Sequence, residues 1–221
     1  MKRHQAGFTL IEIAIVLVIV GLLASTLLIG LAAQREAADY RAAQRQLDDA
    51  GEALLGFAIT YGRLPCPARP GLVSGQDGAG IADCPAGEHG VLPWVTLGLP
   101  ETDPWGRRLT YYAQAEFTAT PTAGAQAGFE LETAGKGKVL DAAGQTTAEE
   151  LPAIVVSHGR RGNGAYLVDG RQLTASGEEA ENADADTRFV AHPPSTEFDD
   201  LVAWVVPGVL KARLVAVGRL P

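Results

Sequence analysis

The sequence has few of the side chains that bind transition metals. It contains two cysteines and four histidines in 221 residues. No Cys-x-x-Cys pair and no cluster of histidines is present, so the four ligands of a structural zinc site are not offered in their usual spacing. Basic residues are also scarce, with 18 Lys and Arg against 26 Asp and Glu, and the net charge is −8. This balance argues against nonspecific nucleic-acid binding, which needs a basic face.

The two cysteines are Cys66 and Cys84. A thiol pair outside the cytosol usually oxidises, so we expect a disulfide between them. Two free thiols or a redox-active pair are the alternatives. A disulfide would close a Gly-rich loop of 17 intervening residues. In the chain-entropy model such a closure contributes about 3 kcal/mol to the free energy of unfolding.

Charge is absent from residue 13 to residue 33. A helix over residues 8–33 would be roughly 39 Å long, enough to cross the ~30 Å hydrocarbon core of a bilayer. Lys2 and Arg3 predict that the N-terminus stays in the cytoplasm. A secretory signal peptide, a plain signal anchor and a buried core helix are the alternatives. The first two do not account for Glu12, because a carboxylate within a span costs about 3 kcal/mol.

The stretch from Gly7 to Glu12 reads Gly-Phe-Thr-Leu-Ile-Glu. It resembles the processing motif of type IV pilins and type II secretion pseudopilins. The resemblance implies cleavage after Gly7, on the cytoplasmic face, and N-methylation of the new terminal residue, Phe8. It also implies that Glu12 of an incoming subunit pairs with the terminal amine of a neighbour, which offsets the cost of a carboxylate in lipid. Glu12 is therefore predicted to act in subunit assembly.

Residues 34–61 contain no proline, and their apolar residues recur every three or four positions, which predicts an amphipathic continuation of the helix. Gly62 is a natural helix end, and Pro65 follows it. The predicted fold is α+β, with a long N-terminal hydrophobic helix packed on a small antiparallel sheet with long loops. The predicted divisions are a leader peptide, a transmembrane and assembly helix, an amphipathic helix and a periplasmic head, at residues 1–7, 8–33, 34–62 and 63–221.

Within the head, several segments have the alternation or β-branched composition of strands. Residues 209–217 are predicted to form a last strand or a short helix. The Ala-, Gly- and acid-rich stretches at residues 113–150 and 171–197 are predicted to be loops. Asp103–Gly106 reads Asp-Pro-Trp-Gly and resembles the segment that starts the sheet of major pseudopilins. The predicted strands cover residues 109–112, 129–133, 153–157, 165–168 and 201–206.

Ser157 and His158 suggest a hydrolase, but neighbours on a strand point to opposite faces and no Gly-x-Ser-x-Gly elbow surrounds Ser157. We therefore predict that the chain is not an enzyme. The loop at residues 159–164 lacks the Lys-Ser/Thr of a phosphate-binding loop and is predicted to be a solvated hairpin tip. Trp94 and Trp105 are predicted to be core aromatics that anchor loops.

An acidic cluster runs through residues 178–186. Calcium prefers carboxylate and carbonyl oxygens, and the resemblance to major pseudopilins implies a calcium site near Asp184 and Asp186. The loop before this pair holds an extra hairpin, which departs from the pseudopilin pattern, and an exposed acidic loop is the alternative. Asp199 and Asp200 are predicted to cap or turn the chain.

Taken together, the resemblance implies a minor pilin or pseudopilin, inserted in the inner membrane by a single span with its head in the periplasm. Its expected partners are the prepilin peptidase and N-methyltransferase, other pilins or pseudopilins, an inner-membrane assembly platform and membrane lipid. Nucleic acid is not expected as a partner. The competing hypothesis is a membrane-anchored periplasmic protein that binds a ligand or DNA and does not polymerise.

Overall fold

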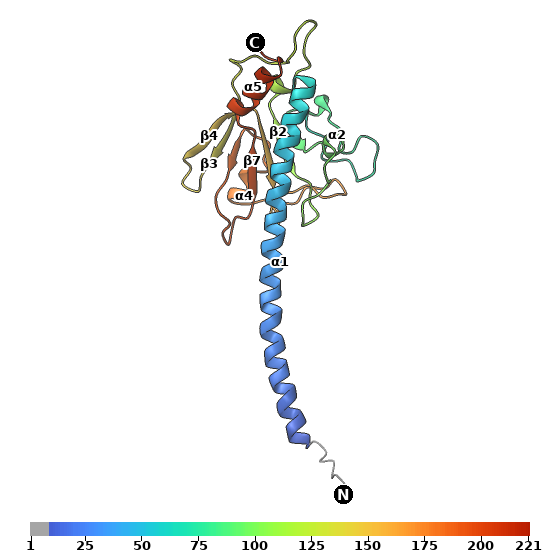
Figure 1. Ribbon diagram of the computed structural model, residues 1–221, viewed down its shortest axis with the longest axis vertical. Helices are drawn as coiled ribbons and strands as arrows, with labels where there is room; N and C mark the ends of the chain where they lie inside the picture. The colour runs from blue at the N-terminus through green and yellow to red at the C-terminus, as the bar shows by residue number, and fades with distance from the viewer. Residues whose placement is uncertain (1–8) are drawn as a thin grey trace. The chain divides into compact units, whose positions relative to one another are not determined.

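The computed structural model describes residues 9–221, with their side chains except those of residues 23–32 and residue 86. One long N-terminal helix is followed by short helices and strands in mixed order (Figure 1). The elements are α1 (Leu10–Tyr61), the 3-10 turn η1 (Cys84–Ala86), β1 (His89–Val91), α2 (Trp94–Leu97), β2 (Thr110–Ala113), α3 (Ala115–Thr118), β3 (Gly137–Leu140), β4 (Thr146–Leu151), β5 (Ala153–Ser157), α4 (Glu178–Glu181), β6 (Arg188–Val190), β7 (Leu201–Trp204) and α5 (Pro207–Ala216).

The chain divides into two compact units, one ending at Arg41 and the other spanning Ala42–Pro221. The first unit holds the N-terminal part of α1. The second unit, called the head below, holds the rest of α1 and every other helix and strand of the described chain. This division falls inside the predicted amphipathic segment, so the last five turns of α1 belong to the head.

Within the head, α1 packs with one apolar face. Leu47, Leu54 and Ala58 are buried at successive steps of seven and four residues, as the periodicity predicts. The helix ends at Tyr61, and Gly62 follows with a φ of +69° while its N–H donates to the carbonyl of Ala58. The predicted helix end is confirmed, because glycine adopts this left-handed conformation without a Cβ clash.

The central sheet of the head has the strand order β1-β2-β5-β7, and all its pairings are antiparallel. Its two faces bury different side chains. Tyr111 and Val155 join the core that contains Leu54 of α1, whereas Tyr112 and Ile154 join a second core on the other face. All five residues of β5 are buried, which accounts for its uninterrupted apolar run.

A second sheet covers that other face. Its order is β4-β3-β6, in which β3 pairs antiparallel with β4 and parallel with β6. Val139 of β3, Leu151 of β4 and Phe189 of β6 fill the core between the two sheets. The β3–β4 hairpin lies to one side of the upper part of α1 in Figure 1 and α2 to the other. The α+β class is confirmed, but the head has three layers, α1, sheet and sheet, where one sheet was predicted.

The predicted strands at 109–112, 153–157 and 201–206 correspond to β2, β5 and β7, but the one at 129–133 is wrong. There the chain turns, because the Thr133 hydroxyl accepts from the Glu130 N–H at 3.0 Å. Phe129 instead anchors the turn, because its ring packs at a tilt against the ring of Phe117 with the two centroids 4.7 Å apart. The predicted strand at 165–168 is reduced to two isolated bridges of Tyr166, to Arg108 and Gln172.

The two stretches predicted to be loops contain further elements. Residues 113–150 hold α3, β3 and most of β4, and residues 171–197 hold α4 and β6. Most side chains of β4 are exposed, so its sequence lacks the apolar alternation of a half-buried strand. Pairing with β3 decides its conformation, which local composition does not encode.

The end of the chain closes over the end of α1. Residues predicted as a last strand or short helix form α5. Arg213 of α5 pairs with Glu52 of α1 at 3.1 Å, and the Arg219 guanidinium donates to the carbonyl of Ile59 at 3.1 Å. The C-terminus therefore lies beside the end of α1 (Figure 1).

Candidate functional site

The first described residues form a helix cap around Glu12. The backbone N–H of Glu12 donates to the Thr9 hydroxyl at 3.3 Å, and Glu12 Oε2 accepts from the N–H and the hydroxyl of Thr9, both at 3.4 Å. This is a capping box, in which a Thr and a Glu three residues later satisfy each other's backbone N–H groups. The Thr-x-x-Glu spacing of a capping box is present in the sequence, but the prediction for Glu12 did not include a cap.

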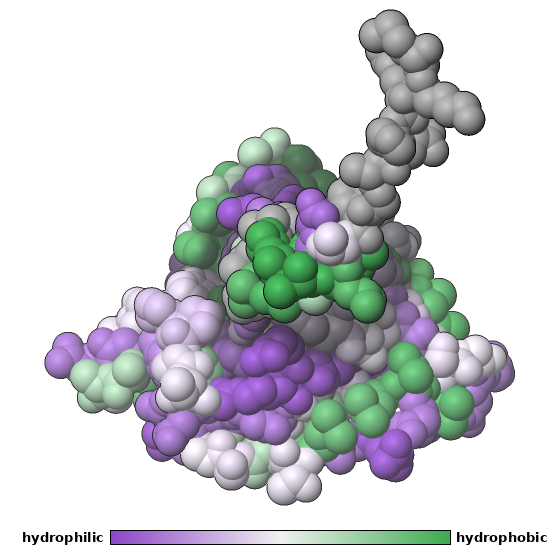
Figure 2. Space-filling model, turned by 90° about the horizontal axis from the view of Figure 1, so that it is seen from below, coloured by the Kyte–Doolittle hydropathy of each residue, from purple (hydrophilic) through white to green (hydrophobic). Residues whose placement is uncertain are grey.

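The residues after Glu12 expose an apolar surface. Leu10 is 90% exposed, Ile13 49% and Leu17 65%. Seen from below in Figure 2, a hydrophobic group of atoms, coloured green, lies at the centre of the view. Contiguous apolar exposure on this scale marks a surface that contacts a membrane or another protein. A search of the described part of the chain for a helix with the length and apolarity of a membrane span found none.

Family comparison bears on this same segment. Residues 2–28 match the prokaryotic N-terminal methylation motif. This motif is the signature of type IV pilins and pseudopilins. It supports a type IV pilin-like protein that is processed as a prepilin, and the predicted resemblance is confirmed over this segment. The match spans Glu12, Gly7 and Phe8, of which Gly7 and Phe8 lie outside the described residues.

The match ends well before the head. No curated protein and no solved structure matches the chain. The function of the head is therefore inferred from its own side chains.

A disulfide joins Cys66 and Cys84, as the sequence predicted. The loop it closes is held from inside by Arg108, whose side chain is fully buried. The guanidinium donates to the carbonyls of Pro70 and Leu72 at 3.0 and 2.7 Å and pairs with Glu101 at 2.7 Å. It also lies 4.8 Å from the ring of Trp94, which confirms the prediction that Trp94 is a core aromatic.

Asp103 organises the Asp-Pro-Trp-Gly turn. Its Oδ1 accepts from the backbone N–H groups of Trp105 and Arg107, and its Oδ2 accepts from the Ser157 hydroxyl at 2.9 Å. Burial raises the pKa of the Asp103 carboxyl, although these hydrogen bonds act in the opposite direction. The turn is thereby tied to the end of β5.

His158 faces away from Ser157. Its Nε2 lies 2.8 Å from the hydroxyl of Thr110, and its Nδ1 lies 3.5 Å from Oδ2 of Asp200. The order hydroxyl, imidazole, carboxylate is that of a hydrolytic triad. However, the side chain of His158 is completely buried, so a substrate bond has no access to it in this conformation. Ser157 and His158 do not form a nucleophile–base pair.

Three carboxylates gather next to this histidine. Glu179 of α4 and Asp199 and Asp200, which precede β7, are 1%, 5% and 2% exposed. One carboxylate oxygen from each lies within 4.8 Å of the other two. Asn182 donates to Asp200 Oδ2 at 2.8 Å. The prediction that the Asp pair merely caps or turns the chain is incomplete, because both side chains enter this buried polar cluster.

The loop after β5 reaches into the cluster, so the prediction of a solvated hairpin tip is wrong. Arg161 Nη2 lies 2.6 Å from Glu179 Oε1, and its backbone N–H donates to Asp199 at 3.0 Å. Asn163 donates to Glu179 Oε2 at 2.6 Å. Burial acts to lower the pKa of Arg161, but Glu179 and Asp199 raise it by more, so the guanidinium stays charged.

Asp184 and Asp186, the predicted calcium ligands, lie apart from this buried cluster on the surface. Together with Glu181 they form a group whose carboxylate oxygens lie within 4.8 Å of one another. Asp184 accepts from the N–H of Asp186 at 3.2 Å, and Asp186 from the N–H of Arg188 at 2.6 Å. These bonds explain the local turn without an ion, and calcium binding here stays a prediction.

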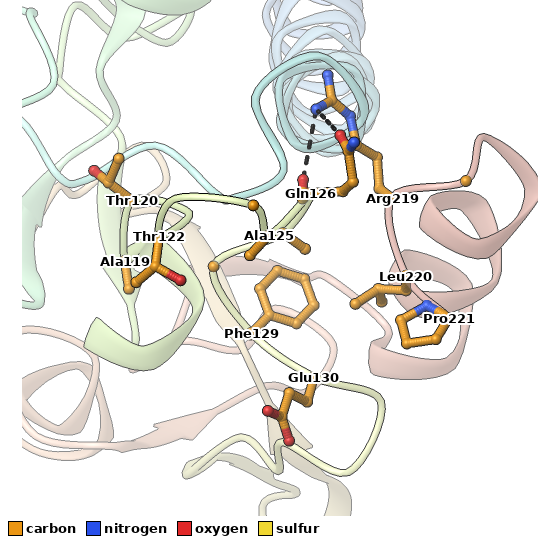
Figure 3. A pocket seen from close by; sticks show the side chains of 14 residues that line it. Ala119, Thr120, Thr122, Ala125, Gln126, Phe129, Glu130, Arg219, Leu220 and Pro221 are labelled. Carbon is orange, nitrogen blue, oxygen red and sulfur yellow. Dashed lines mark hydrogen bonds between the residues drawn. The ribbon is translucent and has the colours of Figure 1, made fainter.

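A hollow of about 550 Å³ lies between the loop at residues 119–130 and residues 218–221 (Figure 3). Phe129 and Leu220 line its apolar side. Its charged side chains are Glu130 and Arg219, and Arg219 is already held by Gln126 and by the carbonyl of Ile59. The hollow therefore offers little charge for recognising a ligand.

Proposed function

We propose that this chain is a pilin-like structural subunit, a minor pilin or pseudopilin. A prepilin peptidase cuts it after Gly7 and methylates Phe8. The mature subunit is anchored in the inner membrane with its head in the periplasm, and assembles with other pilins into a type II secretion pseudopilus or a type IV pilus. The observation that carries the proposal is the methylation motif at residues 2–28, which includes the exposed apolar residues of α1 from Leu10 to Leu22.

Glu12 has a defined place in this proposal. In the isolated chain its carboxylate accepts from Thr9. Cleavage after Gly7 would create a cationic amine at Phe8, one residue before Thr9. In a filament, Glu12 of one subunit would pair with that amine on its neighbour, and each pair would remove an uncompensated charge from the apolar interior.

We expect Glu12→Gln to abolish assembly while leaving leader cleavage and membrane insertion intact. An uncompensated amine in lipid costs about 3 kcal/mol, which is on the order of a hundredfold in an association constant. The measurement is the fraction of protein in sheared filaments, alongside N-terminal mass spectrometry for removal of residues 1–7 and methylation of Phe8.

The matched control is Glu36→Gln, which removes a carboxylate from an exposed position of α1 beyond the motif. Filament yield should be unchanged in this variant. Normal assembly of Glu12→Gln would contradict the assembly role, and an uncut N-terminus in wild type would contradict the prepilin assignment itself.

The machine that uses the subunit can be identified by deletion in the native host. Loss of secreted proteins alone would indicate a type II pseudopilin, and loss of twitching or DNA uptake with intact secretion would indicate a minor pilin. If all three activities persist, the competing proposal of a membrane-anchored periplasmic binding protein is favoured. That alternative also predicts that Glu12→Gln has no effect on the protein's function.

A further inference from the structure

The buried polar cluster concentrates negative charge in the head. Glu179, Asp199 and Asp200 are each at least nine-tenths buried, and their oxygens lie within 4.8 Å of one another. Like charges at this distance repel strongly where water is excluded. A folded head must therefore supply positive charge or donors at this place.

Arg161 supplies both. Its Nη2 lies 2.6 Å from Glu179 Oε1, and its Nε lies 3.5 Å from Asp199 Oδ1. Neutral donors occupy the remaining positions on Glu179, since the Asp199 N–H donates to Oε1 at 3.0 Å and Asn163 donates to Oε2 at 2.6 Å. A metal ion that took Glu179 as a ligand would have to displace these N–H groups.

The segment between Glu179 and Asp199 contains a strand of the second sheet. Glu179 and Asp199 bracket β6, which pairs with β3 and places Phe189 in the core between the sheets. Arg161 lies in the loop that follows β5, which is a strand of the central sheet. The Arg161 ion pairs thus tie both ends of the β6 segment to the central sheet.

We propose that Arg161 is the built-in cation of this cluster and acts as a latch that closes residues 179–199 onto the rest of the head. A guanidinium of the chain itself does here what a bound divalent cation would otherwise have to do. The latch makes the closure of the β6 segment independent of metal ions. It concerns the folding of the head and does not depend on the proposed assembly function.

The test is limited trypsin digestion of the full chain in detergent. Arg188 lies in the latched segment and has a side chain 56% exposed. We expect Arg161→Met to raise the rate of cleavage after Arg188 on the order of tenfold or more, because it leaves buried carboxylates without their cation. Arg45→Met, which removes an arginine from an exposed position of α1 in the head, is the matched control and should be cut at the wild-type rate.

A second variant separates charge balance from general damage. Adding Glu179→Gln to Arg161→Met removes one negative charge and keeps the side-chain shape, so the double variant should recover part of the lost protection. Equal cleavage of Arg161→Met and Arg45→Met would overturn the latch. So would a failure of Glu179→Gln to rescue a poorly folding Arg161→Met.

The effect of metal ions on the melting temperature provides an independent test of the latch. The melting temperature of an Asp184→Asn/Asp186→Asn variant, which lacks the surface acidic pair, should not change with millimolar calcium or with a chelator. A saturable rise with calcium in that variant would show that an ion occupies the buried cluster, and the proposal would be wrong.

Discussion

At the scale of single residues, Asp103 shows how one carboxylate is held by a turn and a strand together. It is 4% exposed, and its two oxygens accept from Trp105, Arg107 and Ser157. Burial opposes its charged form more than these donors favour it, so the pKa of Asp103 is raised. The folded head therefore binds this proton more tightly than the unfolded chain does.

The raised pKa of Asp103 makes the stability of the head depend on pH. As pH rises above the ordinary Asp value of about 4, through the raised pKa of Asp103, the unfolded chain is favoured and stability falls. Asp103→Asn should abolish this part of the slope, because Asn can still accept from both amides and can donate to Ser157. The free energy of unfolding in urea, measured from pH 4 to pH 7, should fall for wild type relative to the variant.

The control for this series is Asp77→Asn, which changes an exposed aspartate in the disulfide loop. Its difference from wild type should not vary with pH. If Asp103→Asn also tracked wild type at every pH, the raised pKa of Asp103 would be wrong.

At the scale of elements, the loop closed by Cys66–Cys84 has two independent constraints. The disulfide limits the unfolded chain, whereas Arg108 holds the folded loop through the carbonyls of Pro70 and Leu72. Replacing both cysteines with alanine should cost about 3 kcal/mol. The loop should keep its folded conformation because Arg108 remains.

The double cysteine variant should thus melt at a lower temperature by thermal denaturation, yet endoproteinase Asp-N should cut before the exposed Asp77 of this loop at nearly the wild-type rate under native conditions. Rapid cleavage at that site would mean that the disulfide alone orders the loop. Wild type treated with a reductant provides the comparison at constant sequence.

Elements also differ in how well local sequence predicted them. The last turns of α1 and the strand β5 were predicted because their apolar periods match helical and buried-strand geometry. The strands β3, β4 and β6 were missed, since most side chains of β4 face solvent and β6 has three residues. Their conformation depends on pairing partners distant in the chain.

At the scale of the whole molecule, the described chain keeps its cores within one unit. The residues of all three apolar cores lie at or beyond Leu47. A fragment of residues 34–221, which retains the helix face from Ala43 onward, should therefore fold without the N-terminal part of α1. Its melting temperature and its disulfide content should equal those of the full chain in detergent.

Circular dichroism and thiol titration would check this expectation. A fragment that melts without cooperativity would show that the head needs residues before position 34. A surface substitution such as Asp77→Asn in the fragment should leave its melting temperature unchanged, which verifies that the assay responds to the core alone.

The candidate sites differ in whether their residues are neighbours in the sequence. Gly7, Phe8 and Glu12 were predicted from a contiguous motif, whose residues are neighbours in the sequence and need no folded structure to be recognised. The capping box of Glu12 was equally local and could have been read from its spacing. By contrast, nothing in the sequence placed Arg161 beside Glu179 and Asp199, since 18 and 38 residues separate them from it.

The sequence by itself determined the N-terminal methylation motif, the amphipathic face of α1, the disulfide pair and three of the four strands of the central sheet, β2, β5 and β7. Periodicity, composition and motif spacing are properties of neighbouring residues, and they carry this information directly. Only the tertiary structure decided the second sheet, the clamp around Arg108 and the buried carboxylate cluster. Each of these forms where segments far apart in the chain meet, and there pairing, burial and charge compensation outweigh local preference.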